Sequence, residues 1–413
     1  MNRKQLTLLI IAGAILGGLG YYLYQNNNQS WEGSDHKPGR KVIKDFPMND
    51  VERVSIRQSQ GQLTLTKKDE KWVVEERGAY PANFSTISDL LRKVWELKVA
   101  QAPKVSSAQL SRLELLPPDK GTNSGTLLEF KDKSGKSLHS LLLGKKHMKS
   151  GGQDDSPMGG GGWPDGRYLM VGNDPKTVAV VSDALANVEA KPEEWLNKDF
   201  FKVENLKSIA VTSATASNNW RLVKPTQTND WVLADAKPGE LPDNSKFVSA
   251  TSALSAPSFN DVATNSSPEA MGLKSPLVAK LETFEGFTYE IKLGSKASPD
   301  KDDYYFQVAV NGDFPKDRAP GKDEKPEDKA KLDKEFQDRT KKLEEKLKAE
   351  KAFEKWTFVV SKYTIEPLLK ERKEFMVEKK EEPKTTEAPA VNPTDIPSLK
   401  PTITPAPKAP AKP

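Results

Sequence analysis

The sequence predicts an α+β protein in which an N-terminal single transmembrane helix precedes two tandem repeats of an antiparallel-sheet-plus-helix unit. A long charged helical insertion and a disordered Pro-rich tail complete the predicted fold. Three observations lead to this prediction. Residues 6–24 carry no charged side chain, the alternating stretches around "EKWVV" (70–74) and "NDWVL" (229–233) introduce the same order of elements, and residues 323–355 alternate acidic and basic side chains.

Residues 1–24 are predicted to form a cytoplasmic tip and a transmembrane anchor. As a helix rising about 1.5 Å per residue, residues 6–24 would span about 28 Å, close to a hydrocarbon core of about 30 Å. Arg3 and Lys4 precede the span, which puts the N-terminus in the cytoplasm and the bulk of the chain in the periplasm or outside. We therefore expect a single-pass protein of the inner membrane, with the bilayer as one partner. A cleaved signal peptide is the alternative.

Gly13 and Gly17 match the GxxxG pattern of pairing helices, which would give a homo-oligomer through the transmembrane helix. A chance match in a glycine-rich span is the alternative.

Composition excludes several classes of site. The chain has 413 residues, 36% of them hydrophobic and 29% charged, and a net charge of +5. This excess is small and scattered, so we expect no nucleic-acid partner. Because there is no cysteine, disulfides, zinc–thiolate sites and thiol nucleophiles are excluded. The three histidines, His36, His139 and His147, have no metal-ligand spacing.

A polar stalk, residues 25–50, leads to the first predicted repeat, residues 51–203. "VERVSIRQ", "QLTLT" and "KWVVEE" alternate apolar and polar side chains, which predicts a three-stranded meander. "PANFSTISDLLRKVWELKV" places Phe84, Ile87, Leu91, Val94 and Trp95 at helical spacing. Two hairpins follow, "LLEF"–"HSLLLG" and "RYLMV"–"TVAVVS", and then a short helix is predicted at "DALANV" (183–188).

The second predicted repeat, residues 204–377, has the same order of elements. "NLKSIAVT" corresponds to "DVERVSIR", and "PEAMGLKSP" corresponds to "LSRLELLPP". Gly294 follows Leu293 as Gly144 follows Leu143. Trp72 and Trp231 then occupy equivalent strands, where a tryptophan is most simply a packing residue.

The two repeats differ in their insertions. The Gly-rich insertion 151–166 in the first repeat is expected to be mobile. The insertion 313–355 in the second repeat contains the charged helix, along which Leu332, Phe336, Leu343 and Leu347 form a thin apolar stripe. The helix is either a solvated arm or a docking arm that pairs with a partner helix in a coiled coil. Residues 378–413 are predicted to be a disordered tail, either a spacer or a segment without a role.

No catalytic, cofactor-binding or metal-binding residue is assigned. The glycine run lacks the phosphate-loop pattern and precedes a strand rather than a helix. The acidic groups Asp154–Asp155 and Asp300, Asp302, Asp303 do not fit the spacing of an EF-hand. The sequence therefore predicts a protein that is not an enzyme and needs no cofactor. A hydrolase that uses two carboxylates in a cleft is an alternative, because sequence does not exclude it.

The pattern "VERVSI…KWVVEE" through "LLLGKK" to "RYLMV…TVAVVSDAL…PEEWLNKDFF" resembles a bacterial family known as a domain of unknown function (number 4340). The resemblance implies a membrane-anchored, extracytoplasmic accessory or scaffold subunit of an ABC-type envelope transport or motility system. It also implies protein partners in an ABC transporter complex. The alternative is an envelope-binding module that binds peptidoglycan or polysaccharide, with Trp163 or another exposed aromatic residue in an open groove.

Overall fold

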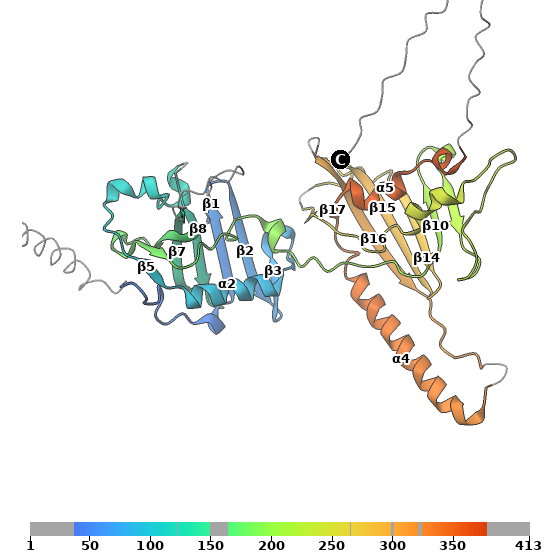
Figure 1. Ribbon diagram of the computed structural model, residues 1–413, viewed down its shortest axis with the longest axis horizontal. Coiled ribbons are helices and arrows are strands. Elements are labelled where there is room, and N and C mark those ends of the chain that lie inside the picture. Colours follow the sequence, from blue (N-terminus) through green and yellow to red (C-terminus); the bar gives the residue numbers. More distant parts are fainter. Residues whose placement is uncertain are drawn as a thin grey trace, which may run out of the picture. The chain divides into compact units, whose positions relative to one another are not determined.

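The computed structural model describes residues 37–121, 123–148, 164–264, 266–298, 301–320 and 324–377. The stretch 6–24, the first part of the stalk, His36, most of the Gly-rich insertion with Trp163, and the tail 378–413 lie outside these ranges. The described chain forms two antiparallel sheets, sheet 1 and sheet 2 (Figure 1). Both sheets belong to one compact unit that ends at Met376.

Sheet 1 has nine strands in the order β4-β3-β2-β1-β6-β7-β8-β9-β5. In chain order they are β1 (Arg53–Gln58), β2 (Gly61–Lys68), β3 (Lys71–Val74), β4 (Tyr80–Pro81), β5 (Val99–Gln101), β6 (Thr126–Lys131), β7 (Ser137–Met148), β8 (Pro164–Val171) and β9 (Ala179–Val181). Alternating apolar residues of β1 and β2, such as Val54 and Leu65, pair across the ladder and are fully buried.

Sheet 2 has eight strands in the order β12-β11-β10-β14-β15-β16-β17-β13. In chain order they are β10 (Leu206–Thr212), β11 (Trp220–Val223), β12 (Val232–Leu233), β13 (Asp261–Val262), β14 (Leu277–Thr283), β15 (Phe287–Ser298), β16 (Lys301–Gly312) and β17 (Phe358–Ser361). Apart from β4, each strand of sheet 1 has a counterpart at the same place in sheet 2.

The strand registers show which residues are equivalent. Leu65 pairs with Val74 in sheet 1, and Leu222 pairs with Leu233 in sheet 2. Counting back two residues from Val74 and Leu233 places Trp72 and Trp231 at the same position. Trp72 is buried, and the partly buried Trp231 packs against the core. Both tryptophans are therefore packing residues.

Gly144 and Gly294 make the same close contact in the two sheets. A Cβ atom at Gly144 would lie 2.3 Å from the carbonyl oxygen of Leu113, and one at Gly294 would lie 2.0 Å from that of Met271. Leu113 and Met271 belong to the connecting segments that the sequence comparison matched. A side chain at either glycine would push this connection away from the strand.

The described helices are few. They are α2 (Phe84–Glu96), α3 (Val248–Thr251), α4 (Pro326–Lys351) and α5 (Lys362–Leu369), with short 3-10 turns between elements. α2 lies across sheet 1 (Figure 1) and buries Ile87, Leu90, Leu91 and Val94. The side chains of Phe84 and Trp95, which the helical spacing assigned to the same face, are 67% and 45% exposed. The predicted short helix at 183–188 is wrong, since these residues form loop and turn.

The predicted α+β class with an N-terminal transmembrane helix is corrected by the structure, which consists mostly of two antiparallel sheets. Among the described residues, no helix has both the length and the apolar character needed to cross a bilayer. α2 has 13 residues, about 20 Å, which is shorter than a hydrocarbon core. α4 has 26 residues, but charged side chains dominate it. The expectation of a single-pass inner-membrane protein is therefore not supported, and the stretch 6–24 on which it rested lies outside the described residues.

Residues from both sheets meet at a junction that contains aromatic rings and the ion-paired Arg77. Tyr80 of β4 contacts the rings of Phe259 and Trp356 edge-on, at centroid distances of 5.8 and 5.1 Å. Nearby, Arg77 donates two hydrogen bonds to the carboxylate of Asp261, at 2.6 and 2.8 Å. The edge strands β4 and β13 thus lie where the two halves of the unit are joined.

Candidate functional site

α4 is attached to sheet 2 through its C-terminal end. Glu350, the one buried residue of the helix, is 6% exposed. Its carboxylate accepts hydrogen bonds from the hydroxyl of Tyr289 at 2.8 Å and from the backbone N–H of Lys202 at 3.3 Å. Just beyond the helix, Glu354 accepts a hydrogen bond from the backbone N–H of Val310 at 2.9 Å. These three bonds tie the helix end to β15, to β16 and to the segment that joins the two sheets.

Burial shifts the pKa values of Glu350 and Tyr289 at this attachment. Loss of water raises the pKa of Glu350, and the hydrogen bonds from Tyr289 and Lys202 only partly oppose that effect. Burial also raises the pKa of Tyr289, with the nearby Glu350 carboxyl as the next cause. The hydroxyl of Tyr289 therefore remains a hydrogen-bond donor at neutral pH.

Apolar and ionic contacts reinforce the same end of α4. Leu343 and Leu347 are partly buried and pack against the core. Lys346 bonds to the carboxylate of Glu204 at 2.8 Å and to the carbonyl oxygen of Lys202 at 3.2 Å. The inner half of the predicted apolar stripe is thus used in attaching the helix.

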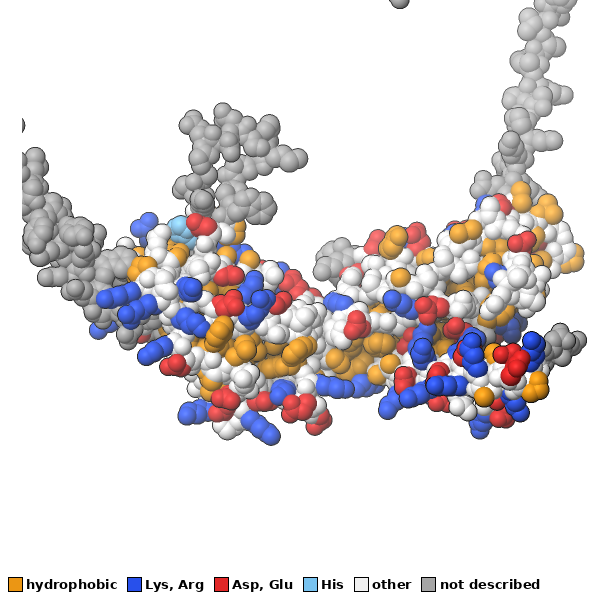
Figure 2. Space-filling view, turned by 60° about the horizontal axis from the view of Figure 1, so that its bottom comes forward, with side chains coloured by type: hydrophobic (Ala, Val, Ile, Leu, Met, Phe, Trp, Pro, Cys, Tyr) orange, Lys and Arg blue, Asp and Glu red, His pale blue; other side chains and the backbone are white. Residues whose placement is uncertain are grey.

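The N-terminal half of α4 carries the rest of the stripe. Most residues in 326–342 are exposed, while Leu332 and Phe336 are partly exposed. Arg318, in the connection that precedes the helix, forms ion pairs with Glu324 and with Asp333 of α4. In Figure 1, the N-terminal half of α4 extends away from sheet 2, to which the C-terminal end of the helix is attached. Figure 2 shows acidic and basic side chains mixed over the surface of the helix. This half of the helix is an available surface for another protein chain.

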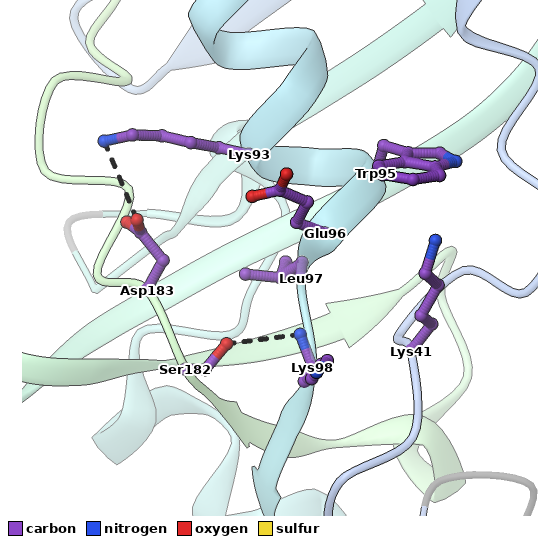
Figure 3. Close-up of a pocket in the computed structure, with 8 residues that line it drawn as sticks. All are labelled: Lys41, Lys93, Trp95, Glu96, Leu97, Lys98, Ser182 and Asp183. Carbon is purple, nitrogen blue, oxygen red and sulfur yellow. Dashed lines mark hydrogen bonds and ion pairs between the residues drawn. The ribbon is translucent and has the colours of Figure 1, made fainter.

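A second candidate surface is a pocket of about 460 Å³ at the C-terminal end of α2 (Figure 3). The Nζ of Lys41 lies 3.4 Å from the centroid of the Trp95 ring, a cation–π contact. Lys93 forms an ion pair with Asp183 at 3.6 Å. Glu96 also lines the pocket. The Trp95 side chain is 45% exposed, and a sugar ring can pack against the exposed part of an indole.

The structure separates the residues considered for metal binding. His139 and His147 lie eight residues apart on β7, on the order of 26 Å along the strand. His147 bonds to Asp165 at 2.6 Å, and Asp303 accepts a hydrogen bond from Asn260 at 2.8 Å. Within the described ranges, no group of three or more His, Asp or Glu side chains is placed to hold a metal ion. Asp154, Asp155 and Asp300 lie outside those ranges.

The hydrolase alternative required two facing carboxylates in a cleft, one with a raised pKa. Burial raises the pKa of the Glu350 carboxyl group. It is enclosed between Tyr289 and the chain at Lys202 rather than open to a cleft. Its geometry thus favours a structural role over acid–base chemistry.

Sequence reasoning did not identify Glu350 or the Trp95 pocket. A lone glutamate in a charged helix gives no pattern that separates it from its solvated neighbours. The sequence did contain a signal for the exposure of Trp95. The buried face of α2 is complete without Phe84 and Trp95, which lie at its margin, and consists of Ile87, Leu90, Leu91 and Val94.

Comparison with known proteins identifies a family model that matches part of the chain. Residues 158–276 match the family model described as Domain of unknown function (DUF4340). The matched segment includes the strands from β8 to β13. It therefore covers part of sheet 1, the connection between the sheets and part of sheet 2. No curated protein and no solved structure matches the chain. The resemblance to this domain-of-unknown-function family is therefore supported for residues 158–276.

Proposed function

We propose that this protein is a non-enzymatic scaffold that docks another protein through α4, as an accessory subunit of an ABC-type transport or motility system. The observation that supports docking is the division of α4 into two halves. Its C-terminal end is held by Glu350, Leu343 and Leu347, and its N-terminal half leaves Leu332 and Phe336 partly exposed among charged residues. The link to an ABC transporter rests on the family resemblance alone.

The geometry suits recognition by a helix. Leu332 and Phe336 are four residues apart, so they lie on one side of α4 about one turn from each other. An amphipathic partner helix could cover both side chains, and the surrounding charges would select its register. Because the attachment at Glu350 lies more than three turns away, a change at Leu332 should leave the fold of sheet 2 intact.

Crosslinking in the native cells followed by purification of the full-length protein tests this proposal. We expect a permease or ATPase of an ABC transporter to be recovered with the natural sequence. The double variant Leu332→Glu/Phe336→Glu should lose that partner, whereas the control Lys334→Glu/Lys341→Glu, which changes exposed residues of the same helix, should retain it. Equal recovery with both double variants would contradict docking on this side of α4.

The pocket beside Trp95 favours a second candidate, a module that binds peptidoglycan or another polysaccharide. Its test is sedimentation with purified peptidoglycan. This candidate predicts that Trp95→Ala abolishes co-sedimentation and that Phe84→Ala, at the other end of the same helix, does not. Recovery of glycan with no protein partner from the crosslinked cells would replace the scaffold proposal with this one.

A further inference from the structure

Sheet 1 contains a second, strongly basic pocket, which has no part in the proposed docking function. It has a volume of about 620 Å³ and lies between the end of β7 and the loop that follows β5. Four of its lining residues are lysine or arginine, one is histidine, and none is acidic. They are Lys104, Arg112, Lys145, Lys146 and His147, with Tyr168 among the neutral residues.

The fold builds this pocket through a close contact at Gly144. Since Gly144 has no side chain, the carbonyl oxygen of Leu113 can rest against β7. The loop before it is shaped by a capping box between Ser106 and Gln109, which opens the 3-10 turn Ser107–Gln109. A separate apolar cluster, which includes Leu110 and Leu115, holds this loop on the sheet. The basic side chains therefore stand on a backbone that is fixed on both sides of the pocket.

Much of the positive charge here is not neutralised within the protein. His147 is paired with Asp165, and Lys146 lies near Glu189, whose main partner is Lys191. Within the described ranges, the structure records no ion pair for Lys104, Arg112 or Lys145. Like charges brought together in a concave site repel one another and attract anions.

The equivalent place in sheet 2 shows that the fold does not require all of these charges. Gly294 and Met271 repeat the close contact. Ser295 stands in the place of Lys145 and Ala270 in that of Arg112, whereas Lys296 repeats Lys146. Ser295 donates its backbone N–H to the carbonyl oxygen of Met271 at 2.9 Å, so the strand and the connection bond directly to each other. Arg112 and Lys145 are thus additions to the shared architecture.

We propose that this pocket binds a ligand through its phosphate groups. A phosphate offers up to two negative charges and several acceptor oxygens, which matches several ammonium groups and a guanidinium better than a single carboxylate does. Tyr168 and Gln109 add neutral hydrogen-bond donors to the lining. The phosphate could belong to a soluble phosphorylated molecule or to a lipid headgroup, since the contacts are the same.

Binding of two probes to the full-length protein at low ionic strength tests the proposal. Inorganic pyrophosphate, followed by calorimetry, represents a soluble ligand. Vesicles containing phosphatidic acid, compared with phosphatidylcholine vesicles in a sedimentation assay, represent a lipid headgroup. We expect binding of at least one probe that weakens as salt is added. The double variant Lys104→Glu/Lys145→Glu should weaken it by about tenfold or more, because it removes two attractions and adds two repulsions.

The control Lys133→Glu/Lys136→Glu alters the net charge equally, at the turn at the other end of β7, and should change binding by less than about twofold. All four lysines are exposed, so both variants should keep the melting temperature of the natural protein. Binding of pyrophosphate alone would identify a soluble ligand, and binding of phosphatidic acid vesicles alone a lipid headgroup. Binding of neither probe, or equal loss in both double variants, would overturn the proposal. None of these outcomes depends on whether α4 docks a partner.

Discussion

The carboxyl group of Glu350 makes the folded state sensitive to pH at the residue scale. Because burial raises its pKa above the ordinary value of 4.5, the folded protein binds this proton more tightly than the unfolded chain does. The corresponding stability is fully present below pH 4.5 and is lost as the pH rises through the folded-state pKa. The contribution of Glu350 to the attachment of α4 should therefore be greatest in acid, whereas the ion pair between Lys346 and Glu204, which lowers the pKa of Glu204, weakens there.

Glu350→Gln tests this reasoning, because glutamine keeps an oxygen acceptor for Tyr289 and cannot ionise. We expect the free energy of unfolding of the variant, relative to the natural protein, to rise between pH 4.5 and pH 7.5. Urea denaturation at both pH values measures it, with the exposed Glu345→Gln as the control for a lost charge. A difference that stays the same at the two pH values would show that burial of the ionised form has no net cost.

At the scale of elements, alternation of apolar residues predicted the long strands well, and it could not predict the shortest ones. β4, β12 and β13 have two residues each, which is too few for a period of two to be seen. The positions of β5 and β13 at the ends of their sheets result from crossovers that pass over several strands. The pairing of β5 with β9 and of β13 with β17 joins segments far apart in the chain. The local pattern of apolar residues does not contain information on such long-range pairing.

The close contact at Gly144 gives a prediction for the β7 element. Gly144→Ala would place a Cβ atom 2.3 Å from the oxygen of Leu113 and 2.8 Å from a carbon of Leu115. Since a backbone atom must move, we expect a loss of about 1–3 kcal/mol in the free energy of unfolding. Ser140→Ala on the same strand should change it by less than about 0.5 kcal/mol. Equal denaturation midpoints for the two variants would mean that the connection is not held against β7.

At the scale of the whole molecule, the ion pair at the junction could not be found from sequence. Arg77 and Asp261 are 184 residues apart, and each looks like an ordinary surface residue. Their side chains are 19% and 26% exposed, so the pair is partly shielded from water. The repeated order of elements suggests two similar halves, but it does not reveal that their edge strands are joined.

A double-mutant cycle of Arg77→Ala and Asp261→Ala measures this connection. Each single variant should lose stability, and the coupling free energy should be about 1 kcal/mol, because the two hydrogen bonds are charge-assisted while solvent still screens the pair. Thermal or chemical denaturation of the four proteins provides the values. Purely additive effects would show that the ion pair contributes nothing to holding the halves together.

The central claim is that the outer half of α4 is a docking surface, and one measurement tests it most directly. A photo-crosslinking amino acid is placed at Phe336 in the native cells, and in parallel at the exposed Lys71 of sheet 1. The docking account predicts that position 336 forms a covalent adduct with an ABC transporter component and that position 71 does not. If position 336 gives no adduct, or gives the same set of adducts as position 71, the claim is contradicted.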